Sequence, residues 1–148
     1  MSISNEARTT DEKVRDEIVY NLVSGNMIFL ETTAEQRKKE LLKSVIKQLR
    51  KRSRVFYLDC RKKGQDPNIK KVFQNRYWII GRLFNINPKN MIIFLDNIQH
   101  MSNKNCEVIK YYFDHDNIKS VLFVGESYSQ VKLSPSIKHR IGKRVFRI

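Results

Sequence analysis

The stretch IFLETTAEQRKKELLKSV (28–45) has the order of elements with which many nucleotide-binding domains begin. A short apolar run at residues 27–30 is followed by a polar turn and then by an amphipathic segment with helical spacing. In a nucleotide-binding domain such a turn surrounds the phosphates, and a lysine at the helix start reaches the terminal ones. The order of elements therefore predicts a candidate phosphate site at this turn.

The turn before Lys38 lacks the residues that usually surround a phosphate. Residues 31–36 read ETTAEQ and contain no glycine, whereas a phosphate-binding loop uses glycine backbone amides that curl around the anion. Thr32 and Glu35 instead form a capping box, which predicts an ordinary helix start at Thr32. The carboxylates of Glu31 and Glu35 would also repel a phosphate. We therefore expect weak nucleotide binding or none, and no bound cofactor.

The charge of the chain is large and unevenly distributed. Its 148 residues contain 29 Lys and Arg against 15 Asp and Glu, giving a net charge of +14. Residues 37–63 contain twelve basic and two acidic residues, and residues 138–148 contain five basic residues and no acidic one. This excess favours a polyanionic partner, because binding to nucleic acid releases condensed counterions.

The first basic segment places its charges on one predicted helix face. Lys39, Lys43 and Lys47 recur every four residues, opposite an apolar stripe that includes Leu42 and Val45. We expect these side chains to contact the phosphate backbone of nucleic acid, DNA in preference to RNA, without reading sequence. The alternative is a solvated or protein-facing surface. The complete candidate nucleic-acid set is Lys39, Lys43, Lys47, Arg50, Lys51, Arg52, Arg54, Arg61, Lys62, Lys63, Lys143 and Arg144.

The elements that would position these residues alternate between strands and helices. Continuous apolar runs predict buried strands at residues 27–30, 54–60, 91–96 and 120–127, the last three covered on both faces, with a further strand near the C-terminus. Helical periodicity separates them, over residues 9–24, 32–49, 69–84 and 108–113. This alternation predicts an α/β fold, a three-layer α/β/α sandwich on a mainly parallel sheet, as one domain over residues 1–148.

The remaining composition excludes several classes of protein. Cys60 and Cys106 are far apart and have no Cys or His at ligand spacing, so we expect two buried thiols and no metal site. No apolar run approaches the roughly 20 residues of a membrane span, and the first residues lack the layout of a secretory signal. We expect a cytoplasmic protein that does not enter a membrane.

In this order the elements resemble the P-loop NTPase core of AAA+ and origin-recognition-type archaeal ATPases. The resemblance covers nearly the whole chain and depends on three segments. These are MIIFLDN (91–97) as the Walker B strand, SVLFVGES (120–127) as the sensor strand, and SPSIKHRIGKRVFRI (134–148) as the arginine-bearing end of the core. It implies a five-stranded, mainly parallel sheet and an AAA+ core without the lid domain.

The resemblance also assigns roles to individual residues. Aligned with the Walker A motif GxxxxGK[ST], the segment RKKELLK (37–43) keeps the lysine, Lys38, but neither glycine nor the hydroxyl residue. Asn97 replaces the glutamate that would activate water after Asp96, and an amide cannot accept that proton. The residual nucleotide-binding set is Lys38, Asp96, Asn97, Ser127 as the sensor residue and Arg140 as the arginine finger. Glu126 is an alternative sensor residue. We expect a pseudo-ATPase with no catalytic residues.

Three functions remain open at this level. In the first, a non-hydrolysing AAA+-like domain binds the backbone of nucleic acid. In the second, a structural subunit docks on an active ATPase, another replication-type protein or a further copy of itself, and Arg140 completes the neighbour's site. In the third, which is the weakest, Lys38 and Asp96 still bind ATP without hydrolysing it.

Overall fold

The computed structural model describes residues 2–61 and 91–148, with side chains from residue 10 onward in the first segment. The predicted helix over residues 69–84, together with Lys62 and Lys63, lies outside the described residues. The described elements are α1 (Ser2–Ser24), β1 (Met27–Glu31), α2 (Glu35–Leu49), β2 (Arg54–Asp59), β3 (Met91–Asp96), the 3₁₀ turn η2 (Ile98–His100), α4 (Asn103–Asp114), β4 (Ser120–Gly125), α5 (Pro135–Ile141) and β5 (Val145–Arg147).

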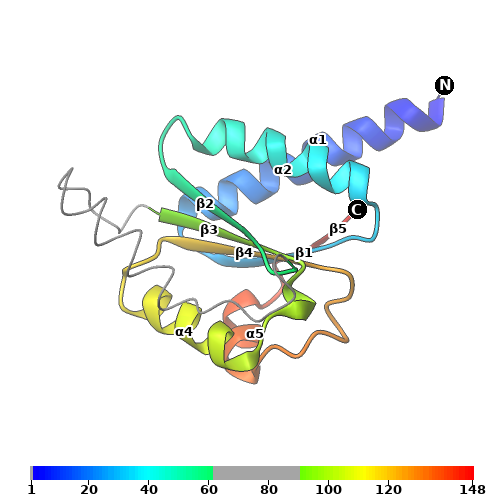
Figure 1. Cartoon of the computed structure of the whole chain (residues 1–148). Coiled ribbons are helices and arrows are strands. Elements are labelled where there is room, and N and C mark those ends of the chain that lie inside the picture. The colour runs from blue at the N-terminus through cyan, green and yellow to red at the C-terminus, as the bar shows by residue number, and fades with distance from the viewer. Residues whose placement is uncertain (1, 62–90) are drawn as a thin grey trace.

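The five strands form one sheet in the order β2-β3-β4-β1-β5. Every pair of neighbours is parallel. Helices α1 and α2 cover one face of this sheet and α4 and α5 cover the other (Figure 1). The predicted three-layer α/β/α sandwich with a five-stranded sheet is confirmed, and the sheet is entirely parallel.

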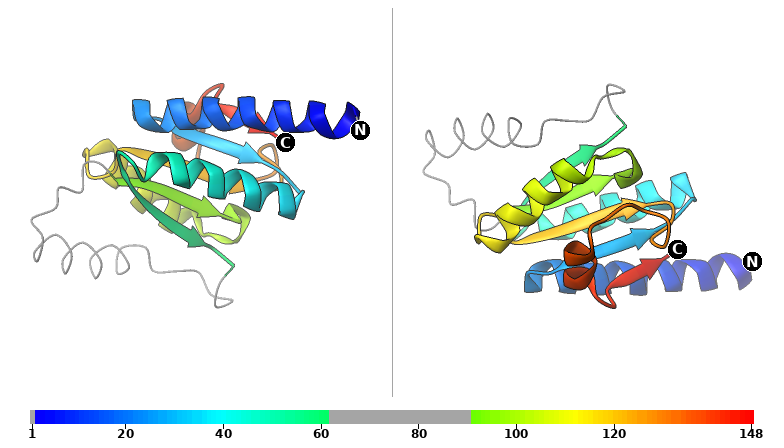
Figure 2. Two further views of the ribbon diagram at one scale, coloured as in Figure 1. Left: turned by 90° about the horizontal axis from the view of Figure 1, so that it is seen from above. Right: turned by 90° about the horizontal axis from the view of Figure 1, so that it is seen from below.

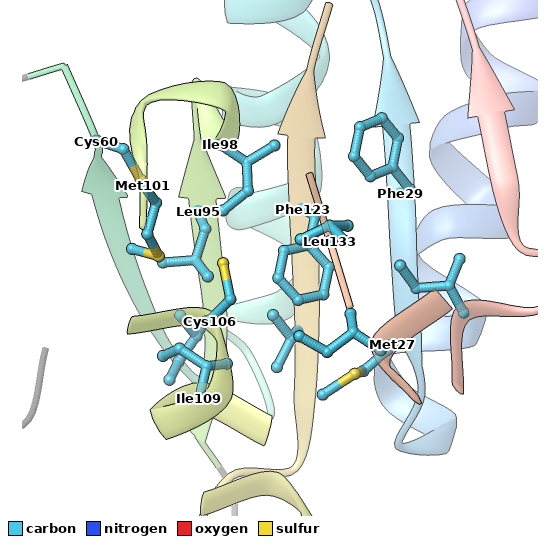
Figure 3. Packing of buried hydrophobic residues seen from close by; sticks show 14 of the residues in the cluster. Met27, Phe29, Cys60, Leu95, Ile98, Met101, Cys106, Ile109, Phe123 and Leu133 are labelled. Atoms are coloured by element: carbon cyan, nitrogen blue, oxygen red, sulfur yellow. The ribbon is translucent and has the colours of Figure 1, made fainter. Parts of the chain in front are cut away.

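Side chains alternate between the two faces of each central strand and fill two cores. Ile28 and Leu30 join α1 and α2 on one face, while Met27 and Phe29 pack with Phe123 and Ile109 on the other (Figure 3). The views from above and below show α1 beside α2 and α4 near α5 (Figure 2). The continuous apolar runs of β3 and β4 are explained because both faces of these strands are buried.

Two local predictions were wrong. Strand β2 is only partly buried, since it lies at the edge of the described sheet, and 44% of Tyr57 is exposed. The capping box at Thr32 does not form either: α2 begins at Glu35, and Ala34 precedes it without a side-chain cap. Thr32 Oγ1 instead accepts a hydrogen bond from Ala34 N, at 3.1 Å, within the turn.

Helix α1 ends at Ser24, as the sequence predicts. Gly25 ends α1 with a φ of +88°, which is the left-handed conformation that glycine adopts at helix ends. Cys60 and Cys106 are both buried, as expected. None of the helices in the described ranges is long and apolar enough to cross a membrane.

Candidate nucleic-acid interface and the nucleotide-site position

The carboxyl ends of the parallel strands meet at one edge of the sheet. Glu31, Asp59, Asp96 and Gly125 end β1, β2, β3 and β4 at this edge. Helix α2 starts here as well, after a turn of residues 32–34 alone. Crevices at the carboxyl ends of parallel strands are where such folds bind ligands, so this edge is the position of the candidate nucleotide site.

Lys38 and Asp96 meet at this edge, as the resemblance implied. Lys38 Nζ lies 3.2 Å from Asp96 Oδ1 and 3.1 Å from Glu35 Oε1. The side chains of Lys38 and Asp96 are 5% and 4% exposed, whereas that of Glu35 is 52% exposed. The ammonium group is thus buried and held between two carboxylates of the chain itself.

Tyr57 completes the contacts of Asp96 from the edge strand. Its hydroxyl donates a hydrogen bond to Asp96 Oδ2, and Asn97 N donates to Asp96 Oδ1 at 2.8 Å. Burial, together with the bond to this carboxylate, raises the pKa of Tyr57 well above its ordinary value. Both oxygens of Asp96 are therefore engaged by groups of the protein.

Asn97 forms a second polar contact beside the first. Its side-chain amide donates to Asp59 Oδ1 at 2.9 Å, and its φ of 55° places it in the left-handed region, which asparagine tolerates better than most residues. Burial acts to raise the pKa of Asp59, but hydrogen bonds from Arg61 and Asn97 outweigh it, so the pKa is lowered. Asn97 therefore positions the end of β2 against β3.

Glu31 points toward the opposite side of this edge. Its Oε1 accepts a hydrogen bond from Tyr128 N at 2.9 Å, and its Oε2 lies 2.7 Å from Arg147 Nε. These contacts join β1 to β5 and to the loop after β4. Because both carboxylate oxygens are engaged, Glu31 serves as a connection within the fold.

Two other members of the predicted nucleotide set make contacts elsewhere. Ser127 Oγ lies 3.2 Å from Ser129 Oγ. Arg140 forms a bidentate pair with Asp114 of α4, at 2.8 and 2.7 Å, and also donates to Ser136 O at 2.9 Å. The predicted nucleotide set thus separates into a cluster of Lys38, Asp96 and Asn97 and two residues, Ser127 and Arg140, that bond to groups outside that cluster.

Helix α2 carries an extended basic surface next to the buried lysine. Leu41, Leu42, Val45 and Leu49 are buried against the sheet. The opposite side of α2 and the segment that follows expose a group that we call the basic face: Lys39, Lys43, Lys47, Arg50, Lys51, Arg52 and Arg54. Among the described side chains, no member of the basic face forms an ion pair. The predicted exposure of Lys39, Lys43 and Lys47 is confirmed.

The other predicted basic residues do not extend this face uniformly. Arg61 is exposed and paired with Asp59, at 3.4 Å. Lys143 is exposed, whereas Arg144 is partly buried and donates to Arg140 O and Ile141 O at the end of α5. Lys143 and Arg144 connect α5 to β5, the edge strand farthest from β2 in the sheet order. The two basic segments of the sequence therefore lie at different parts of the molecule.

Tyr57 and Asp59 were not predicted from the sequence as members of the cluster at the carboxyl edge. Both lie in a run that reads as a buried strand, and their roles depend on Asp96 and Asn97, far away in the chain. One signal was present, since a tyrosine hydroxyl and a carboxylate in an apolar run need polar partners when they are buried.

No protein-family model and no curated protein matches the chain. Solved structures do resemble it. Cdc6p from Pyrobaculum aerophilum has a TM-score of 0.65 and 13% identity, over 92% of this chain and 44% of its own. A Drosophila ORC structure with AT-rich DNA and Cdc6 has a TM-score of 0.67 and 12% identity, over 99% and 30%. DnaA bound to AMPPCP and single-stranded DNA has a TM-score of 0.59 and 17% identity, over 92% and 44%.

These structures share their fold with this chain. The order of elements, the parallel sheet and the helical layers are those of the AAA+ P-loop NTPase core found in DnaA and Cdc6. This chain spans less than half the length of each of the three proteins. The predicted AAA+ core fold is thus confirmed, at identities that carry the fold alone.

Proposed function

We propose that this domain is a non-hydrolysing, AAA+-like module that binds nucleic acid, DNA in preference to RNA, through its phosphate backbone. The observation that carries the proposal is the basic face of α2, with seven exposed Lys and Arg side chains that form no ion pair among the described side chains. Unpaired like charges at helical spacing repel one another, and a polyanion removes this repulsion.

The dimensions of the face fit a phosphate backbone. Lys39 and Lys47 are eight residues apart on α2, which is about 12 Å along the helix axis. Successive phosphates of one DNA strand advance by about 3.4 Å along the duplex axis. The three lysines of α2 can therefore contact about three phosphates. Lysine contacts of this kind hold the backbone and do not read bases.

The absence of hydrolysis is supported by the groups at the carboxyl edge. Asn97 follows Asp96, and its side-chain amide is bound to Asp59. An amide is not a general base, so it cannot take a proton from an attacking water. Lys38 is paired with two carboxylates, and the turn of residues 32–34 supplies no glycine amides to surround a phosphate.

The resemblance to replication proteins supports DNA as the preferred ligand. The Drosophila ORC structure is described as bound to AT-rich DNA, and the DnaA structure as bound to single-stranded DNA. The alternative, in which Arg140 completes a neighbour's site, is less well supported. It would require Arg140 to leave its bidentate pair with Asp114.

The test is a salt titration of binding. The full chain is mixed with a labelled random-sequence duplex, a single strand and an RNA duplex between about 50 and 200 mM salt, where six or more phosphate contacts change affinity about a thousandfold. We expect a steep slope that is shared by unrelated DNA sequences, with weaker binding to RNA. No binding at the lowest salt concentration would refute the proposal.

A further inference from the structure

A closed cluster of polar side chains fixes the first turn of α2 to the carboxyl end of β3. Lys38 Nζ contacts Asp96 Oδ1 and Glu35 Oε1. The second oxygen of Asp96, Oδ2, accepts a hydrogen bond from the hydroxyl of Tyr57. Among the described residues, no buried side-chain nitrogen or oxygen lacks a hydrogen-bond partner. We call Glu35, Lys38, Tyr57 and Asp96 the lysine cluster.

The lysine cluster balances its charge within the chain. An ammonium group as buried as that of Lys38 is costly unless it is paired and hydrogen-bonded. Asp96 supplies a buried negative charge at 3.2 Å, and Glu35 a half-exposed one at 3.1 Å. The ammonium therefore has its counter-charges from the protein, at a position where a phosphate would otherwise supply them.

The cluster also sets the orientation of the basic face. Lys38 is the residue before Lys39, and both belong to the same rigid helix. Because the side chain of Lys38 is fixed to β3, rotation of α2 about its axis is restricted at its first turn. The direction in which Lys39, Lys43 and Lys47 project depends on this restriction together with the packing of the buried apolar side of α2 against the sheet, since residues four apart lie on one helix face.

We propose that the lysine cluster is an internal substitute for a bound phosphate. The carboxylates of Asp96 and Glu35 take the anion's place on Lys38 and hold α2 in its binding orientation without a nucleotide. Lys38 is then a positioning residue. The role of Lys38 in DNA binding rests on the function proposed above. The proposal that α2 keeps its orientation without a bound nucleotide does not rest on it.

The experiment compares two adjacent lysines of the full chain. Lys38→Met removes the buried charge, and Lys39→Met removes an exposed charge and serves as the matched control. Each protein is melted with and without saturating Mg-ATP, and its affinity for duplex DNA is measured across the salt range. Asp96→Asn is a second, nearly isosteric variant, in case Lys38→Met does not fold.

The two lysine variants are expected to change different quantities, the Tm in Lys38→Met and the salt slope of DNA binding in Lys39→Met. Lys38→Met should lower the Tm by about 10 °C, because it leaves Asp96 buried without its cation. It should weaken binding equally at every salt concentration, with an unchanged slope. Lys39→Met should leave the Tm unchanged and reduce the slope by about one. Mg-ATP should not change the Tm of the wild type.

Asp96→Asn provides a result that a purely structural role would not produce. It keeps the size of the side chain but leaves Lys38 with the half-exposed Glu35 as its remaining carboxylate. We expect inorganic phosphate to raise the Tm of this variant above that in chloride of equal ionic strength, and not to raise the Tm of the wild type. If phosphate changes the Tm of both proteins equally, the proposal that the carboxylates take the place of a phosphate is refuted.

Other outcomes separate the two proposals. Stabilisation of the wild type by Mg-ATP that disappears in Lys38→Met would show that Lys38 binds phosphate, and would overturn the inference. Unchanged DNA affinity in folded Lys38→Met would overturn the positioning role. If the wild type binds no DNA, the proposed function fails, and the melting experiments alone decide whether the cluster replaces a phosphate.

Discussion

Neutralising the three lysines of α2 provides the most direct test of the basic face. The variant carries Lys39→Gln, Lys43→Gln and Lys47→Gln, which remove three charges but keep long side chains that favour a helix. All three positions are exposed, and none forms an ion pair among the described side chains, so the fold should not change. Any change in binding is therefore attributable to the lost charges.

The expected magnitude follows from the number of contacts. Each phosphate contact on duplex DNA contributes about 0.9 to the slope of log affinity against log salt, so three contacts contribute about 2.7. When salt rises fourfold, from about 50 to 200 mM, the affinity of both proteins falls. The fold-loss of the variant should be about 40 times smaller than the fold-loss of the wild type. Fluorescence anisotropy with two unrelated duplexes measures both slopes.

The control changes the same charge elsewhere. Lys104→Gln, Lys119→Gln and Lys132→Gln also remove three charges, but from positions outside α2. If the basic face is the binding surface, this control should keep most of the slope of the wild type. Equal slopes for the control and the α2 variant would refute the reasoning, because only the net charge would then matter.

Three further predictions concern the fold around these sites. Gly125→Ala should lower the free energy of unfolding by about 1–3 kcal/mol in urea, because the new Cβ would lie 2.9 Å from Ile98 Cγ2. Because the pKa of Tyr57 is raised in the folded state, its hydroxyl contributes stability that is fully present below about pH 10 and is lost as pH rises through the folded-state pKa. The Tm values of Tyr57→Phe and of the wild type should therefore converge at alkaline pH. A double-mutant cycle on Arg140 and Asp114, both partly exposed, should give a coupling of about 0.2–1 kcal/mol, and no measurable coupling would indicate that Asp114 does not hold Arg140 in solution.

The buried strands and the exposed lysines of α2 were predictable because the sequence patterns that indicate them are local. The runs at residues 91–95 and 121–124 are apolar throughout, and they form most of the buried strands β3 and β4. The four-residue spacing of Lys39, Lys43 and Lys47 predicts one shared helix face, and all three side chains are exposed in the structure. Periodicity of this kind needs no knowledge of distant parts of the chain.

The contacts at the carboxyl edge were predictable only in part. The resemblance placed Lys38 and Asp96 together, but the hydroxyl of Tyr57 and the carboxylate of Asp59 join them from a strand whose register the sequence does not reveal. The start of α2 was misplaced because the hydroxyl of Thr32 bonds within the turn, which competes with capping of the helix. Such competition is decided by the path of the chain between β1 and α2.

Lys38 and Lys39 illustrate why residue type alone does not assign function. They are identical neighbours in one helix, yet Lys38 is 5% exposed between carboxylates, and Lys39 is exposed and makes no ion pair among the described side chains. A buried, paired charge contributes to function through the geometry it maintains, and an exposed, unpaired charge through the ligand it attracts. If the domain binds DNA as proposed, removing Lys38 changes how much protein is correctly oriented, whereas removing Lys39 changes how strongly salt competes. The separation of these two effects in one titration distinguishes a domain that carries its own counter-charges from one that still needs a nucleotide.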